Sequence, residues 1–134
     1  MKVILDTNVF VSGVFNSVPP YQILKAWRDD RVQLVVSLEI LGEYRRVGRI
    51  LARDHPSVDL EPILAFVVRN AILLVVPALQ ERVCEDPDDD KFLACALAGG
   101  DCMIVSGDRH LLNVSGYHEI TILRPREFVE RYLE

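Results

Sequence analysis

The stretch 86-DPDDDKFLACALAGGDCMIVSGD-108 holds one helix and one strand of a repeating pattern. Its apolar residues from about 89 to 98 follow helical spacing, and the two glycines after them favour the end of a helix. The next run, 102–106, is almost entirely apolar, as expected for a strand buried on both faces. Asp108 follows two residues later. The stretch therefore predicts a buried strand with an acidic residue near its carboxyl end.

The same alternation of strands and helices extends along the chain. Apolar runs predict strands at 2–6, 32–36, 72–76, 102–106 and 120–123. Helical spacing and start signals predict a short turn after the first strand and helices at about 20–30, 38–52, 60–71, 89–98, 109–113 and 125–132. This pattern predicts an α/β fold with three layers, α/β/α, around a central parallel sheet of about five strands. The length of 134 residues predicts a single domain spanning 1–134.

The composition excludes several protein classes. The chain is 50% hydrophobic and 26% charged, which is enough apolar material for a packed core. No apolar run reaches the roughly 20 residues needed to span a bilayer, and Asp6 comes too early for a signal peptide. The three cysteines form no C-x-x-C pair, so we expect buried thiols rather than a disulfide framework. We therefore expect a cytoplasmic protein with no membrane partner.

The net charge of −5 argues against binding nucleic acid through bulk electrostatics. A local basic surface is still present on the helix predicted at 38–52. Residues spaced three or four apart share one face of a helix, and this helix carries such a stripe of arginines: Arg45, Arg46, Arg49 and Arg53. The stripe is a candidate phosphate-contacting surface. The alternative is a solvated face that forms ion pairs with Glu39 or Glu43.

Carboxylates from four separate segments fall at the carboxyl-end rim of the predicted sheet, where parallel sheets bind ligands. They are Asp6, Glu43, the run 86–90 and Asp108. Such a group of like charges suits a hard divalent cation, Mg²⁺ or Mn²⁺, and zinc is disfavoured because no His or Cys cluster accompanies it. Asp90 is the preferred ligand of the acidic run, because it faces the start of the helix.

Each acidic residue also has a local structural interpretation. Asp6 and Asp108 can cap the turns that follow their strands, and Glu43 can pair with Arg46. The other acidic residues of the run are interpreted as turn, cap and solvated charge: Asp86, Asp88 and Asp89. The interpretation as a metal site rests on the joint placement of the carboxylates and not on one residue.

Four motifs resemble those of one known family. They are 3-VILDTNVF-10, 37-SLEILGEYRRV-47, 86-DPDDDKFLACALAGG-100 and 104-IVSGDRHLL-112. In order and spacing they resemble the PIN domain, the nuclease fold of VapC-like toxins. The resemblance implies an acidic catalytic and metal-binding site made of Asp6, Glu43, Asp90 and Asp108. Two polar residues would support it: Asn8, and Ser106, which stands where the family often has Thr and keeps the hydroxyl.

The resemblance implies a metal-dependent endoribonuclease that cleaves RNA with a metal-activated water. Mg²⁺ or Mn²⁺ would be the cofactor. It also implies a small antitoxin that covers the site, often with an Arg, and a homodimer formed through the early helices. Lys91 and Arg109 are further candidates to contact RNA. His110 would either support the acidic residues or lie on the surface.

Two other function classes stay open. A Mg²⁺-dependent phosphatase or phosphotransferase uses a similar rim of carboxylates, but 6-DTN-8 lacks the second Asp of a D-x-D nucleophile motif. A non-catalytic interaction module is the other alternative, and it predicts no metal binding. No G-x-G-x-x-G follows the first strand, which argues against a dinucleotide-binding domain.

Overall fold

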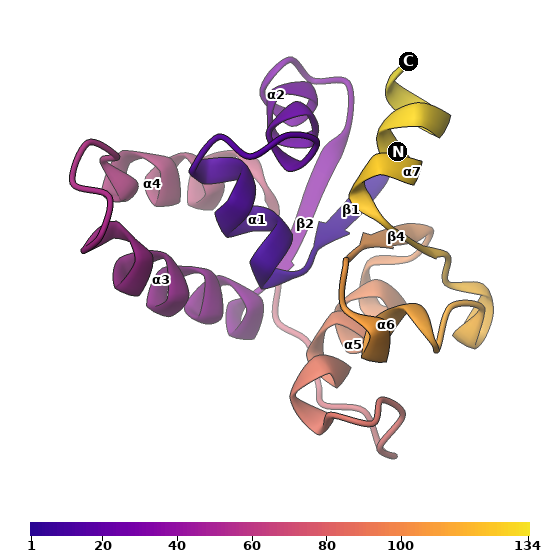
Figure 1. Cartoon of the computed structure of the whole chain (residues 1–134). Coiled ribbons are helices and arrows are strands. Elements are labelled where there is room, and N and C mark those ends of the chain that lie inside the picture. The colour runs from indigo at the N-terminus through magenta and orange to yellow at the C-terminus, as the bar shows by residue number, and fades with distance from the viewer.

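The computed structural model describes residues 1–134 and contains one parallel sheet of five strands (Figure 1). The strand order is β3-β2-β1-β4-β5, and every neighbouring pair is parallel. The bounds are Lys2–Leu5 for β1, Gln33–Ser37 for β2, Ile72–Leu74 for β3, Cys102–Val105 for β4 and Ile122–Leu123 for β5. The predicted fold class, α/β with three layers around a parallel sheet, is confirmed.

Helices connect the strands and cover both faces of the sheet (Figure 1). Their bounds are Thr7–Val14 for α1, Pro20–Arg28 for α2, Leu38–Ala52 for α3, Leu60–Asn70 for α4, Asp90–Gly99 for α5, Arg109–Leu112 for α6 and Pro125–Phe128 for α7. Three short turns complete the chain: η1 (Pro87–Asp89), η2 (Tyr117–Glu119) and η3 (Val129–Leu133). None of the helices has the length and apolar character that crossing a membrane requires.

Some elements differ in length from the prediction. The short turn expected after the first strand is the eight-residue helix α1, which begins directly after Asp6. The strand expected at 72–76 ends at Leu74, because β3 is an edge strand that pairs only with β2. Val75 beyond it is 85% exposed. The apolar run alone therefore overestimated the length of an edge strand.

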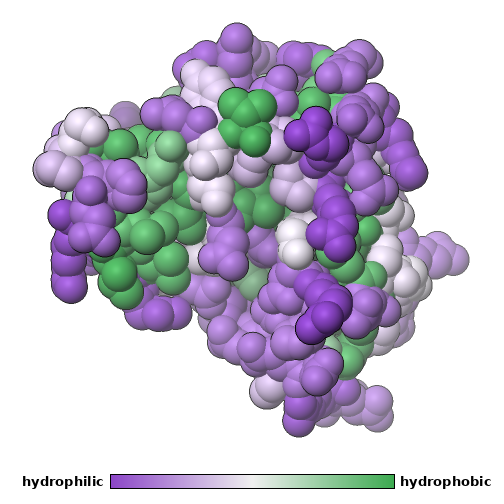
Figure 2. Space-filling view, in the orientation of Figure 1, coloured by the Kyte–Doolittle hydropathy of each residue, from purple (hydrophilic) through white to green (hydrophobic).

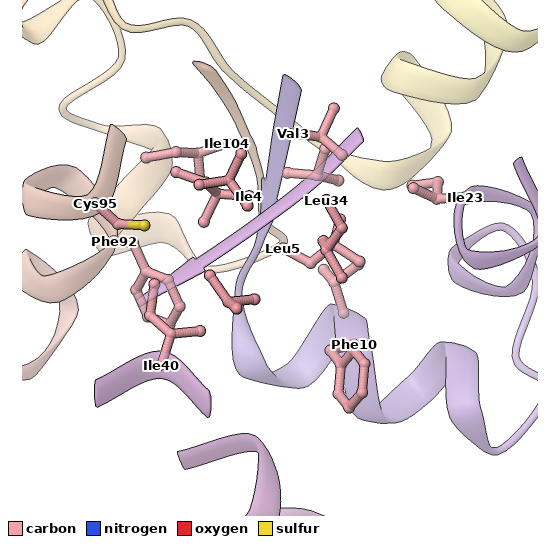
Figure 3. Close-up of a cluster of buried hydrophobic side chains, with 14 of the residues drawn as sticks. Val3, Ile4, Leu5, Phe10, Ile23, Leu34, Ile40, Phe92, Cys95 and Ile104 are labelled. Carbon is pink, nitrogen blue, oxygen red and sulfur yellow. The ribbon is translucent and has the colours of Figure 1, made fainter. Parts of the chain in front are cut away.

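The core fills the space on both sides of the central strands (Figure 3). Ile4 and Ile104 lie toward Phe92 and Cys95 of α5 on one face. On the opposite face, side chains of β1 and β2 pack toward Phe10 of α1 and Ile23 of α2 (Figure 3). Successive side chains on a strand point to opposite faces, so both faces of these strands must be apolar. All three cysteines are buried and free, as expected.

The topology creates a crevice between β1 and β4. From β1 the chain moves outward to β2 and β3, and it then crosses back to β4 on the other side of β1. Leu5 and Val105 are paired in register, so the residues after them, Asp6 and Ser106, lie side by side. The carboxyl ends of two strands that diverge in this way are the usual ligand-binding position of open parallel sheets.

Candidate metal centre

Asp6 and Asp108 are joined through one serine at the crevice between β1 and β4. The Ser106 hydroxyl donates a hydrogen bond to Asp6 Oδ2. It also accepts a hydrogen bond from the backbone N–H of Asp108, at 2.9 Å. Ser106 is fully buried, so its orientation is fixed by the sheet. The serine therefore holds two carboxylates that are 102 positions apart in the sequence, counted from 6 to 108, in one arrangement.

Both carboxylates also cap a helix. Asp6 Oδ1 accepts the backbone N–H of Val9 at 2.8 Å, and Asp108 Oδ1 accepts that of His110 at 2.8 Å. The local interpretation of these residues as caps therefore holds together with their placement at the rim. Asp6 is only 4% exposed, and this burial raises its pKa, although the hydrogen bonds from Ser106 and Val9 oppose the shift. A cation beside Asp6 would relieve that desolvation.

Glu43 is connected to the same crevice through Thr7. The Thr7 hydroxyl donates a hydrogen bond to Glu43 Oε1, and the Lys91 ammonium forms an ion pair with Glu43 Oε2. The Glu43 side chain is 16% exposed, so both of its oxygens are held in a largely buried setting. The expected alternative partner, Arg46, forms no ion pair with it. Glu43 thus already has a cation, whereas Asp6 has none.

Asp90 is hydrogen-bonded to the loop that precedes it. Its Oδ2 accepts the backbone N–H of Val83 at 3.0 Å, and its Oδ1 accepts that of Cys84 at 2.7 Å. Burial alone would raise the pKa of Asp90, but these two hydrogen bonds lower it below its usual value. Asp90 was expected to be the preferred ligand of the acidic run. Its two oxygens hold the backbone of the loop that leads into η1, and each keeps a second lone pair.

Asp89, the residue before Asp90, has a different environment. Its Oδ2 is buried and has no hydrogen-bond partner. Burial raises the pKa of Asp89 to about 6, and the negative charges of Asp108 and Asp86 add to the rise. A buried oxygen without a donor is rare, because leaving it unsatisfied is costly. This atom is where a bound cation would do most to stabilise the site.

His110 completes the group around Asp89. Its Nδ1 lies 3.7 Å from Asp89 Oδ2 and 3.8 Å from Asp108 Oδ1. Ligand atoms of Asp86, Asp89 and His110 all lie within 4.8 Å of one another. Two carboxylates and an imidazole at this spacing suit a divalent cation such as Mn²⁺. Sequence reasoning assigned no ligand role to His110, although His110 follows Asp108 by two residues in 108-DRH-110.

The match to a family comes from the first four-fifths of the chain. Residues 2–110 match the PIN domain family, and they contain every residue of the site described above. The chain belongs to the PIN domain family. It is also similar to an uncharacterized protein of Methanocaldococcus jannaschii, with 26% identity over 98% of this chain and 92% of that protein. PIN domains are generally metal-dependent nucleases, and the acidic group around Asp89 is consistent with that chemistry.

The acidic residues of this PIN domain open into two separate hollows. One, of about 380 Å³, is lined by Asp6, Asn8 and Asp108 between α1 and α7. The other, of about 560 Å³, lies between α3 and α5 and is lined by Glu43, Asp90 and Lys91 with further charged residues. In Figure 2 the surface over α5 and α6 is mostly hydrophilic, while hydrophobic residues gather over α3 and α4. The predicted site residues are thus divided between two neighbouring hollows.

The arginine stripe of α3 is only partly directed at the site. Arg46 lines the larger hollow beside Glu43. Arg49 instead forms an ion pair with Glu61 of α4 at 3.0 Å. Neither Glu39 nor Glu43 pairs with any arginine of the stripe, so the alternative interpretation, ion pairs along the same helix, is not what the structure shows. Of the four arginines, Arg46 is the one that lines a hollow with an acidic residue of the site.

Proposed function

We propose that this protein is a metal-dependent endoribonuclease that cleaves phosphodiester bonds of RNA. The observation that carries the proposal is the buried Oδ2 of Asp89, which accepts no hydrogen bond and lies near His110, itself beside Asp108. A buried carboxylate oxygen without a donor is rare in a stable fold and calls for a partner. A Mg²⁺ or Mn²⁺ ion there would supply the missing charge. PIN domain membership supports nuclease chemistry at this position.

Each residue of the site has a distinct part in this proposal. We propose that Asp89 and Asp108 hold the metal together with Asp6, which Ser106 joins to Asp108. Ligand atoms of Asp86 and His110 lie within 4.8 Å of one of Asp89. When bound, the metal would bind a phosphate oxygen and lower the pKa of a coordinated water, which makes that water a nucleophile. Ser106 fixes the angle between Asp6 and Asp108 through its two hydrogen bonds. Asn8 is exposed at the rim, where its amide can contact the substrate.

The ligand set proposed here differs from the set implied by family resemblance in two positions. We place Asp89 where the resemblance implies Asp90, because Asp89 Oδ2 is buried without a hydrogen-bond partner, whereas Asp90 already accepts two backbone N–H groups. Glu43 lies at the edge of the group, where it is held by Thr7 and Lys91. We therefore propose Asp6, Asp89 and Asp108 as ligands and Glu43 as a residue that shapes the neighbouring hollow.

RNA would approach this acidic site along α3. Arg46 is exposed and lines the hollow next to Glu43, so its guanidinium is available to a phosphate. The other arginines of the stripe would contribute less, since Arg49 is already paired with Glu61. The Arg46→Ala variant should weaken RNA binding, and Arg69→Ala, on an exposed position of α4, is the matched control. Equal losses in the two variants would remove α3 from the proposed path.

The test of the function is cleavage of a mixed RNA substrate by the purified protein with Mg²⁺, Mn²⁺ or EDTA. We expect metal-dependent cleavage by the wild type and its loss in Asp6→Asn and in Asp89→Asn. Asp54→Asn, at an exposed position outside both hollows, is the control and should cleave normally. Trapping of a phosphorylated protein without RNA cleavage would indicate a phosphatase. Absence of both cleavage and Mn²⁺ binding would indicate an interaction module.

We also propose that the nuclease is a VapC-like toxin of a toxin–antitoxin pair. An antitoxin segment with an Arg would then complement the uncompensated charge of Asp6 and Asp89.

An apolar hollow between α1, α2 and α4, lined by Phe10, Trp27 and Phe66 among others, supports the expected homodimer contact through the early helices. Phe66→Ser should shift the mass measured by light scattering to that of one chain. Expression of the wild type that halts growth, and expression of the cleavage-dead Asp6→Asn variant that does not, would support the toxin role.

A further inference from the structure

Lys91 is a largely buried lysine whose ammonium group has all its hydrogen-bonding positions filled. It forms an ion pair with Glu43, lies 3.0 Å from Asp88 Oδ1, and donates to the backbone carbonyl of Asp88 at 3.0 Å. Its side chain is only 11% exposed. An ammonium group has three N–H donors, and here three oxygens receive them. A charge buried to this degree persists only when it is paired in this way.

The contacts of Lys91 join two elements of the site. Glu43 comes from α3, whereas Asp88 comes from η1, directly before α5. Thr7 approaches Glu43 from the other side, at the start of α1. The ammonium group therefore lies at one end of the acidic group, between Glu43 and Asp88, and the opposite end around Asp89 and His110 has no lysine or arginine in contact with it.

Charge is therefore distributed unevenly over the acidic residues. At the Glu43 end, one fixed positive charge faces two carboxylates. At the Asp89 end, Asp89 and Asp108 lie beside the imidazole of His110, and Asp6 is joined to Asp108 through Ser106, with no lysine or arginine paired to any of the three. A second divalent cation beside Glu43 would have to approach the Lys91 ammonium closely, and like charges at contact distance repel strongly in a partly buried position. At the Glu43 end, the Lys91 ammonium group therefore already neutralises the carboxylate.

We propose that Lys91 is a positioning residue that takes the place of a second metal ion at Glu43, so that this protein binds a single divalent cation, at the Asp6–Asp89–Asp108 end. The inference rests on the proposed metal site but does not require that RNA is the substrate. Glu43 then serves to anchor Lys91 and Thr7 and is not a direct ligand. In this proposal the charge of the Lys91 side chain determines whether one or two ions bind.

The test counts Mn²⁺ ions bound per chain, from the electron paramagnetic resonance signal of free Mn²⁺ during a titration of the metal-free protein. We expect one tightly bound ion in the wild type. Lys91→Met keeps the length of the apolar stem but removes the charge, which leaves Glu43 and Asp88 without a cation; we expect a second bound ion. Lys91→Arg keeps the charge and should again bind one. The double variant Lys91→Met with Glu43→Gln should also return to one.

A second variant keeps the inference testable if Lys91→Met does not fold, which its circular dichroism melt would reveal. Glu43→Gln should bind its single Mn²⁺ with an affinity within about twofold of wild type, whereas loss of a true ligand or of a group that orients one costs about 10–100-fold. The inference is overturned by two tight ions in the wild type, by no Mn²⁺ binding at all, or by a large loss of affinity in Glu43→Gln. The wild type could bind one ion and the Lys91→Met variant two, while the wild type cleaves no RNA. That result would overturn the proposed function and leave this inference standing.

Discussion

The two neighbouring aspartates at the start of α5 have opposite environments. Asp90 accepts two backbone N–H groups, and these lower its pKa although burial opposes the shift. Asp89, one position earlier, has a buried oxygen with no donor, and burial together with Asp108 raises its pKa to about 6. The difference separates a carboxylate whose oxygens hold the backbone from one that we propose as a ligand of the cation. Adjacent residues of the same type can thus have different functions, and the predictions below test that separation.

The largest effect is expected on metal-induced stabilisation. An ion that binds only the folded state stabilises it by about 2.7 kcal/mol when its concentration is 100 times its Kd. Mn²⁺ should therefore raise the melting temperature of the wild type, and Asp89→Asn should lose most of that rise because its buried oxygen no longer carries charge. Asp90→Asn is the matched control, and it should keep the rise. Calorimetric melts with Mn²⁺ and with EDTA measure both; an equal rise in the two variants would remove Asp89 from the metal site.

The next effect concerns stability without metal. In Asp90→Ala the N–H groups of Val83 and Cys84 lose their acceptor, and a buried donor left without a partner costs about 1–3 kcal/mol. We expect a loss of that size in the free energy of unfolding, measured by urea denaturation in EDTA. Asp89→Ala removes no hydrogen bond from Oδ2, so its stability should be unchanged or higher. If Asp89→Ala were the less stable of the two, the assignment of roles would be reversed.

This separation of roles also marks the limit of what the sequence could predict. The helix at Leu38–Ala52 was predicted with its observed bounds, because Ser37 caps it and its apolar residues repeat at helical spacing. The positions of Asp6 and Asp108 at the rim followed from the parallel sheet alone. Such signals are local, so they can be read from a short window of residues.

The different environments of Asp89 and Asp90 could not be predicted, because they depend on information that is not local. It depends on how residues 75–86 return to place the N–H groups of Val83 and Cys84 against Asp90. No periodicity specifies that path, since the segment contains neither a strand nor a helix. The partner of Glu43 was missed for the same reason. Lys91 reaches it from a different helix, whereas the pattern suggested Arg46 on the same one.

A smaller effect, with a defined direction, is expected on the pH dependence of stability. The ordinary pKa of an aspartate is 3.8, and the pKa of Asp89 in the folded protein is about 6. Between these two pH values the folded state therefore binds more protons than the unfolded state. Stability from this group is therefore complete below about pH 4 and is lost as the pH rises toward about 6. In EDTA, Asp89→Asn should match the wild type near pH 4 and melt at a higher temperature at pH 7. A difference that is constant across this range would show that Asp89 does not titrate in it.

The smallest expected effect is on the choice of metal. An imidazole nitrogen beside two carboxylates favours Mn²⁺ over Mg²⁺, because Mg²⁺ prefers oxygen ligands only. His110→Asn keeps a polar side chain on α6 but replaces the ring, and it should reduce Mn²⁺ affinity by several-fold while leaving Mg²⁺ affinity nearly unchanged. Calorimetric titration with each ion gives the ratio, and His118→Asn on η2 is the matched control. Equal losses for both ions would place His110 outside the coordination of the metal, where it would only contact Asp89 and Asp108.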